Sequence, residues 1–299
     1  YQAETSQGVL QSIFEYQTMI CDITGMDVSN ASIYDGASAA AEAVNMCRER
    51  KRSKALVSAL MHPDYISAIK TYPNFHGNLE KAQEIGEIAH EKGAKFGMSV
   101  NPISLGLVKS PREYGADVAV GDGQALGLPI SFGGPYIGFM ACTDAMKRSL
   151  PGRIVGATED HQGRTGYVLT LQAREQHIRR EKASSNVCSN QALCALAVGV
   201  YLAAVGKEGL QQAAELCLSK AHYMAAELEK IGFKRTEDGE FFNEFVTESE
   251  IPSDKVLAAL EKEDILGGYP LDEKRILWCC TEVNDKASID RAVQLIKEV

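Results

Sequence analysis

The first two thirds of the chain alternate between short apolar runs and stretches whose apolar residues recur at helical spacing. Helices are predicted where this spacing is regular, at Leu10–Ile20 before a turn at Gly25, Asp35–Arg50, Pro63–Thr71 and Asn78–Gly93. Short apolar runs, the candidates for strands, lie at Val28–Tyr34, Lys54–Met61, Lys95–Val100, Asp117–Gly121 and Ile137–Ala141. Strands that alternate with helices, with glycine at the joints, predict an α/β fold with a mainly parallel sheet.

The last third continues this pattern and then changes to a smaller unit. The first elements predicted here are a strand at Tyr167–Leu171, a polar helix at Gln172–Lys182 and a long apolar helix at Gln191–Val205. A smaller α/β lobe follows, with a helix at Leu210–Ile231, strands at Phe242–Val246 and Ile276–Thr281, and a final helix at Lys286–Glu298. We therefore expect a large domain over residues 1–207 and a small C-terminal domain over residues 208–299.

One joint breaks the alternation. The helix predicted to end near Thr71 runs directly into YPNFHGN, a turn sequence that should follow a strand. A strand and a helix are missing from the alternation there, so we predict that residues are absent between Thr71 and Tyr72. The chain also begins with Tyr1 rather than methionine, and we expect its native start to precede this sequence.

The composition is that of a globular protein, with 45% hydrophobic and 24% charged residues. A net charge of −9 argues against nucleic acid and anionic membrane surfaces as general partners. The longest apolar run, Cys194–Val205, is shorter than the ~20 residues of a membrane span and is typical of a buried helix. Eight cysteines without a CxxC pair and six scattered histidines indicate a reducing compartment and no protein-bound metal.

The predicted polar helix has no apolar stripe, because Ile178 is its only sizeable apolar residue. Its charged residues give it a net charge of +2 on an acidic protein: Arg174, Arg179, Arg180 and Lys182 against Glu175 and Glu181. Glu175 and Arg179 are spaced for an i,i+4 ion pair, whereas His177 has no evident carboxylate partner. The helix is either a solvated surface helix or, with the small polar side chains of Ser184, Ser185 and Asn186 after it, a site for an anion or a subunit.

Two glycine-containing segments are further candidates. Gly36, Ala37 and Ser38 open a helix after an apolar run, so their backbone N–H groups could face an anion. Asp35 before them would repel a phosphate, and a tight turn with a helix cap is the alternative.

The second segment, Val118–Ala141, has the form of a strand end, an active-site turn and the next strand. Gly133 and Gly134 would let its backbone approach a neighbouring group closely. The turn contains no nucleophile and no lysine, and its most prominent polar side chain is Gln124. A plain crossover loop is the alternative.

Together these segments resemble the glycine-decarboxylating P-protein of the glycine cleavage system. The stretches that carry the resemblance are YQAETSQG (Tyr1–Gly8), DGASAAAEA (Asp35–Ala43), GLPISFGGPYIGFMA (Gly127–Ala141), PGRIVG (Pro151–Gly156), LQAREQHIRREKASSN (Leu171–Asn186) and ILGGYP (Ile265–Pro270). The resemblance spans essentially the whole chain. It implies a fold type I pyridoxal-phosphate-dependent, transferase-like architecture: a large domain with a seven-stranded, mostly parallel sheet and a small C-terminal α/β domain.

In many bacteria the P-protein is divided into two homologous subunits, one of which lacks the cofactor lysine. Laid on the lysine-bearing kind, the resemblance places the lysine position at Gln124 and the acidic position near the pyridine nitrogen at about Ser99. An amide cannot form an imine, and a serine supplies no full negative charge. The chain therefore resembles the lysine-free kind, called subunit 1 or alpha, and the resemblance implies no pyridoxal phosphate on this chain alone.

The resemblance also implies partners. With a lysine-bearing subunit 2 that binds pyridoxal phosphate, in a heterotetramer in the bacterial cytoplasm, the chain is expected to decarboxylate glycine and transfer the aminomethyl group to the lipoyl group of the H-protein. By analogy with fold type I dimers, Ser184, Ser185 and Asn186 are expected to approach the partner's cofactor phosphate. A set of basic residues is expected to line that interface or meet an acidic carrier: Arg174, His177, Arg179 and Arg180. The alternative is a purely structural or regulatory subunit that supplies no active-site atoms.

Overall fold

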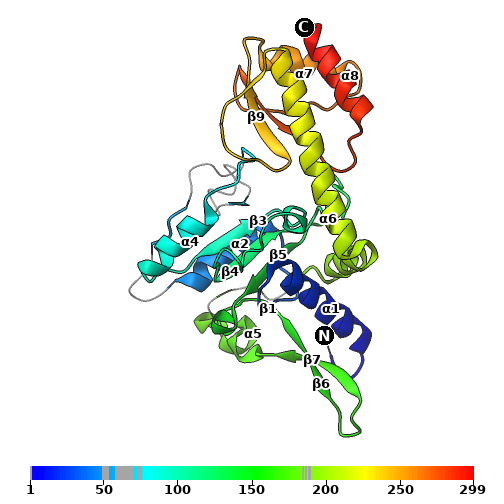
Figure 1. The fold of residues 1–299 in the computed structure, drawn as a ribbon. Coiled ribbons are helices and arrows are strands. Elements are labelled where there is room, and N and C mark those ends of the chain that lie inside the picture. The colour runs from blue at the N-terminus through cyan, green and yellow to red at the C-terminus, as the bar shows by residue number, and fades with distance from the viewer. Residues whose placement is uncertain are drawn as a thin grey trace. The chain divides into compact units, whose positions relative to one another are not determined.

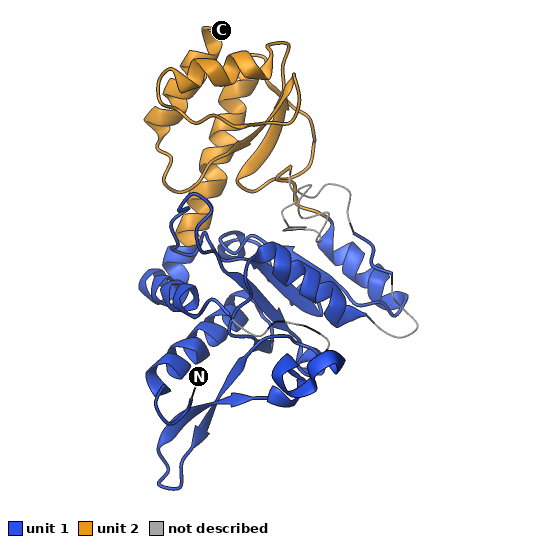
Figure 2. Cartoon of the chain, turned by 180° about the vertical axis from the view of Figure 1, so that it is seen from behind, with its two compact units in different colours: residues 1–71, 81–210 blue, residues 72–80, 211–299 orange. Residues whose placement is uncertain are grey.

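The structure, a computed structural model, describes residues 2–48, 54–57, 71–72, 76–183, 185, 187 and 190–299. The chain divides into two units, which are coloured separately in Figure 2. The first unit comprises residues 1–71 and 81–210, and the second comprises residues 72–80 and 211–299. Each unit contains its own sheet.

The first unit contains a five-stranded sheet (Figure 1). Its strands lie in the order β1 (Val28–Ser29), β5 (Gly138–Cys142), β4 (Val118–Asp122), β3 (Gly97–Val100) and β2 (Thr71–Tyr72). β3 and β4 run parallel, whereas β5 runs antiparallel to both β4 and β1. The α/β fold is confirmed, but the described sheet is mixed, where seven mostly parallel strands are expected. β5 is antiparallel because it follows β4 through a loop and not through a helical crossover.

The alanine-rich helix α2 (Gly36–Cys47) packs on this sheet. Its buried Ala39 and Ala40 share a core cluster with Val120 of β4, because small side chains let a helix backbone approach a sheet closely. Asp35 caps α2 as predicted, and its side chain accepts a hydrogen bond from the backbone N–H of Ser38.

Two other predicted helices of this unit also form. α1 (Gln7–Thr24) ends at Gly25, which adopts the left-handed conformation with φ of 70°. α4 (Ala82–Glu91) begins later than predicted, because Asn78 forms a β-bridge with Phe241.

The prediction of a buried strand at Lys54–Met61 is wrong for its described half. Lys54–Val57 has no regular structure, and the side chain of Leu56 is fully exposed. A buried strand needs a neighbour to pair with and a surface to cover it, and in the described part of the chain these residues have neither. Residues 58–61 and most of the predicted helix Pro63–Thr71 lie outside the described residues, and Thr71 itself belongs to β2.

A β-hairpin made of β6 (Ile154–Glu159) and β7 (Thr165–Thr170) follows β5. The apolar pattern of the sequence predicts β7 but not β6. The hairpin packs against α1, with Val155 in one core cluster with Leu10 and Ile13.

The single polar helix predicted over Gln172–Lys182 does not form. The segment folds into three short turns: η3 (Gln172–Arg174), α5 (Gln176–Arg179) and η4 (Arg180–Lys182). Glu175 is extended, with φ of −80° and ψ of 156°, and Arg180 has a positive φ of 54° with ψ of −127°. Both conformations interrupt the regular hydrogen bonds of an α-helix.

The second unit contains a four-stranded antiparallel sheet in the order β10 (Tyr269–Pro270), β11 (Arg275–Cys279), β9 (Glu244–Glu248) and β8 (Lys234–Arg235). Its core includes the buried Trp278, whose indole N–H donates to the hydroxyl of Thr247 over 2.7 Å. The two predicted strands and the final helix, α8 (Lys286–Lys297), are confirmed within two residues at each end. α7 (Ser253–Glu261) and the two-residue strands β8 and β10 were not predicted.

α6 (Ala192–Lys230) contains both predicted apolar helices, Gln191–Val205 and Leu210–Ile231. They are separated at Gly206, whose φ of 62° and ψ of −172° are not helical. In the described part of the chain, α6 is the one helix with the length and apolar composition of a membrane span. Ala195, Val198 and Leu202 are buried, whereas Leu193, Leu196 and Val200 are exposed, so the prediction of a buried helix holds for one face only.

Gly206→Ala is expected to destabilise the protein by about 1–3 kcal/mol, because a backbone with positive φ and extended ψ is open almost only to glycine. Packing cannot cause this loss, since no atom lies within 4 Å of the Cβ position. Gly8→Ala in α1 is the matched control, also in open space but in helical conformation. It is expected to stabilise by about 0.5 kcal/mol. Urea unfolding would measure both, and equal effects of the two changes would contradict this account.

Glu244 gives the second unit a predictable pH dependence. Burial at the start of β9 raises the pKa of its carboxyl to about 7. The folded state therefore keeps a proton that the unfolded state has already lost, so stability falls as the pH rises from about 4.5 to about 7. Glu244→Gln should remove this trend and gain about 1–3 kcal/mol over the wild type between those pH values. The exposed Glu248→Gln on the same strand is the control, and parallel pH profiles for all three proteins would refute the assignment.

Candidate functional site

Two of the segments selected from the sequence meet at the end of β4. The backbone N–H of Gly36, the first residue of α2, donates to Oδ2 of Asp122 over 3.1 Å. The N–H of Ser38 donates to Oδ1 of Asp35 over 2.7 Å. A Cβ at Gly36 would lie 2.8 Å from the backbone nitrogen of Asp122, so only glycine permits this approach. Two carboxylates therefore occupy the start of α2.

The same Asp122 also holds the turn that follows β4. Its Oδ1 accepts the backbone N–H of Gln124 over 2.8 Å. The side-chain amide of Gln124 donates to the carbonyl of Leu128 over 2.7 Å, so this amide is used inside its own turn. Burial raises the pKa of the Asp122 carboxyl, while the two N–H donors oppose that rise. Asp122 is not among the residues predicted from the sequence, although its position directly after an apolar run, two residues before Gln124, was a signal.

Ser99 lies on β3, directly opposite Val120 of β4, and is buried. Its hydroxyl has no hydrogen-bond partner among the described residues. A pyridoxal phosphate site needs free N–H groups for the phosphate, an amine for the aldehyde and an acid near the ring nitrogen. The residues here supply two carboxylates at the helix start, an amide at Gln124 and an uncharged serine. They do not fit that cofactor.

The glycines of the following loop do not touch this region. No atom lies within 4 Å of the Cβ position of Gly133, and Gly134 lies against Ser131 of its own loop. Ser131 and Phe132 both have left-handed backbones, and the Phe132 ring is fully exposed. Gly133 thus serves the turn through its φ of 84°, and the close approach expected of it is not present in the described residues.

A second cluster forms where the polar segment meets β6. The carboxylate of Glu175 has only 2% of its side chain exposed and lies 3.4 Å from Nε of Arg153. The Nδ1 atom of His177 lies 3.7 Å from the same carboxylate. The predicted pairing of Glu175 with Arg179 is therefore wrong, and so is the expectation that His177 has no carboxylate neighbour. Glu175 turns inward to Arg153, which breaks the helix that the spacing predicted.

Arg174 also turns toward its own chain. Its Nη2 donates to the carbonyl of Gly152 over 2.7 Å. Burial lowers the pKa of its guanidinium, and the neighbouring Glu175 opposes this. Arg174 therefore fixes the PGRIVG stretch to the polar segment, in a position that no pattern in the sequence indicates.

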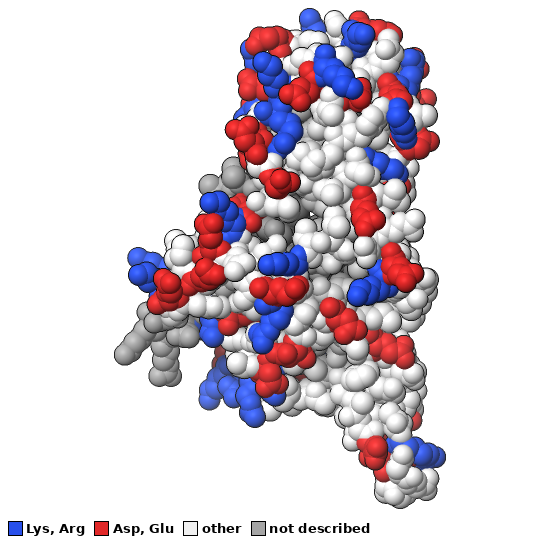
Figure 3. Space-filling model, viewed as in Figure 1, with Lys and Arg blue, Asp and Glu red and all other residues white. Residues whose placement is uncertain are grey.

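The remaining predicted site residues are two arginines of the polar segment and the three small polar residues that follow it. Arg179 and Arg180 are exposed, and Figure 3 shows basic side chains at the position that α5 has in Figure 1. The hydroxyl of Ser185 donates to Oε1 of Glu42 on α2 over 2.8 Å. Ser184 and Asn186 lie outside the described residues.

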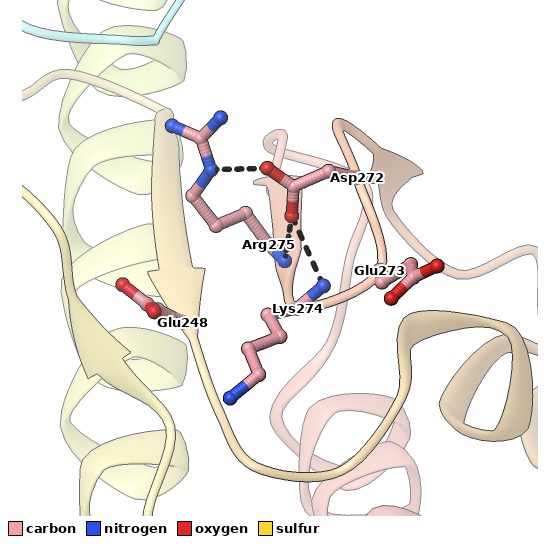
Figure 4. A pocket seen from close by; sticks show the side chains of 5 residues that line it. All are labelled: Glu248, Asp272, Glu273, Lys274 and Arg275. Carbon is pink, nitrogen blue, oxygen red and sulfur yellow. Dashed lines mark hydrogen bonds and ion pairs between the residues drawn. The ribbon is translucent and has the colours of Figure 1, made fainter.

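An open pocket of about 510 Å³ lies in the second unit (Figure 4). It is lined by charged residues only: Glu248, Asp272, Glu273, Lys274 and Arg275. Nε of Arg275 donates to Asp272 over 2.7 Å, within the tight turn shown in Figure 4. Ion pairs on the surface of a turn do not indicate catalysis, and within the described ranges no cluster of His, Cys, Asp or Glu could hold a metal ion.

The chain matches the profile of one protein family, glycine cleavage system P-protein, over residues 1–73 and 68–296. It is 48% identical to a protein of Desulfitobacterium hafniense named probable glycine dehydrogenase (decarboxylating) subunit 1, with 100% of this chain and 77% of the relative covered. That alignment extends over 345 positions, more than the 299 residues of the chain. The two profile matches meet at the joint where residues are predicted to be absent, and that absence stays a prediction.

Comparison with solved structures also finds a P-protein of the glycine cleavage system. The crystal structure of glycine decarboxylase (P-protein) of the glycine cleavage system, in inhibitor-bound form, matches with a TM-score of 0.95 and 40% identity, over 100% of this chain and 77% of that chain. Sphingosine-1-phosphate lyase of Burkholderia pseudomallei matches with a TM-score of 0.71 and 12% identity, over 97% and 76% of the two chains. At that identity only the fold is shared. The expected fold type I architecture is confirmed.

Glu175→Gln is expected to destabilise the first unit by about 2–4 kcal/mol, because it removes the negative charge that lies 3.4 Å from Nε of the largely buried Arg153. Arg153 keeps 19% of its side chain exposed, so the loss should not reach the upper limit for buried pairs. The control is Glu250→Gln, which breaks the exposed pair with Lys274 and should change stability little. Thermal unfolding measures both, and a Glu175→Gln protein as stable as the control would disprove the role of this ion pair.

Proposed function

The chain belongs to the glycine cleavage system P-protein family, and we propose that it is the subunit of a two-subunit glycine dehydrogenase that carries no cofactor. The observation that carries the proposal is the Gln124 turn. At the position expected for the cofactor lysine stands an amide bonded to Leu128, beside a helix start filled by Asp35 and Asp122. Pyridoxal phosphate then belongs to the homologous subunit 2.

The proposed reaction needs both chains. Subunit 2 with its pyridoxal phosphate supplies the electron sink for loss of carbon dioxide from glycine. The aminomethyl group then passes to the lipoyl group of the H-protein. The present chain completes the cofactor pocket of subunit 2 and excludes water from it. The complex is a heterotetramer of two copies of each subunit in the bacterial cytoplasm.

Two features of the polar segment support a role at the subunit interface. The hydroxyl of Ser185 donates to Glu42 and so fixes Ser185 to α2, in keeping with a small polar group placed near the partner's cofactor phosphate. Arg179 and Arg180 are exposed next to it, available to the partner or to an acidic carrier protein. Arg174 would act indirectly, because its guanidinium holds Gly152 in position.

Release of carbon dioxide from carboxyl-labelled glycine should require both subunits and the H-protein. Neither subunit alone should reach about one hundredth of the rate of the pair, because subunit interfaces complete the pocket. If subunit 2 alone turned over as fast as the complex, the chain would be a structural or regulatory subunit.

The same assay tests the basic residues. Arg179→Glu with Arg180→Glu should raise the KM for the H-protein or weaken assembly by about tenfold, and sedimentation of the complex separates these outcomes. Lys255→Glu with Lys262→Glu, at exposed positions in α7 and at its C-cap, is the charge-matched control and should leave both unchanged. Equal effects of the two variants would remove the basic segment from the proposal.

A further inference from the structure

The start of α2 has the form of an anion site but is filled from within the chain. The N–H groups of the first helical turn have no partner inside the helix, and together with the helix dipole they attract negative charge. Here the N–H of Gly36 is taken by Asp122 and the N–H of Ser38 by Asp35. Both acceptors are carboxylates, and neither is part of the helix.

Asp122 differs from an ordinary helix cap. A cap residue lies directly before its helix, as Asp35 does, whereas Asp122 comes from the far end of β4, 86 residues along the chain from Gly36. Its two oxygens bond to two different segments, Gly36 of α2 and Gln124 of the following turn. One carboxylate thus joins a strand, a helix and a turn.

The strand end and the helix start are in close contact. The backbone nitrogen, Cα and Cβ of Asp122 all lie within 3.0 Å of the Cβ position at Gly36, so the helix start rests on the strand end. A phosphate group entering here would have to displace the Asp122 side chain and meet the negative charge of Asp35 as well.

We propose that the carboxylate of Asp122 is an internal anion, which takes the place of a ligand's anionic group at the start of α2 and holds α2, β4 and the Gln124 turn together without a cofactor. The identity of the displaced ligand, a phosphate ester, rests on the proposed function. That Asp122 occupies the start of α2 rests on the contacts of its carboxylate. The chain's loss of the cofactor is then not only the loss of a lysine. The phosphate position is occupied as well.

The test uses the full chain without its partner, with inorganic phosphate and pyridoxal phosphate as separate probes. The wild type should bind neither, by calorimetry and by thermal unfolding in phosphate-free buffer. Asp122→Ala should bind phosphate and gain about 3 °C in Tm at a phosphate concentration about ten times its Kd. Asp35→Ala combined with Asp122→Ala should bind phosphate about tenfold more tightly, because the second negative charge is gone.

Gln124→Ala is the matched control, since it alters the same turn and keeps Asp122. It should bind no phosphate. Should Asp122→Ala fail to fold in phosphate-free buffer, added phosphate must restore folding.

A wild type stabilised by phosphate as strongly as Asp122→Ala would overturn the proposal. So would an Asp122→Ala protein that neither binds phosphate nor is rescued by it. These outcomes do not depend on the glycine reaction, so they separate the failure of this proposal from the failure of the proposed function.

Discussion

The carboxylate of Asp122 is the interaction on which the rest of the first unit depends. β4 lies in the middle of the five-stranded sheet, and in α/β folds ligands bind beyond the carboxyl ends of such strands. At this end the chain supplies its own negative charge, which bonds to the start of α2 and to the Gln124 turn. On our proposal, this carboxylate takes the place of a cofactor's phosphate and so preserves the architecture of the fold without the cofactor.

The Glu175 pair has a comparable effect on the polar segment. From its own residues alone, the segment is predicted to be one polar helix. Instead the ion pair with Arg153 draws Glu175 into the interior and divides the helix into three turns. As a result Arg174 faces its own chain, while Arg179 and Arg180 face outward. Only the outward residues are available to another protein.

The sequence predicts those features whose causes are local. The cap at Asp35, the turn at Gly25 and the strands β3, β4 and β5 follow from capping residues and apolar periodicity. The assignment of Gln124 to the position of the cofactor lysine comes from the family resemblance and not from apolar periodicity.

The features that could not be predicted depend on residues far apart in the sequence. Asp122 meets Gly36, and Glu175 meets Arg153, only when the sheet has formed. The exposed Lys54–Val57 likewise has apolar residues but no neighbouring strand in the described part of the chain.

The central claim is that the working lysine belongs to the other subunit. Its most direct test is borohydride reduction of the assembled complex, followed by mass spectrometry of each subunit. The account predicts a pyridoxyl group on a lysine of the partner alone, and a pyridoxyl group on any lysine of this chain would contradict it.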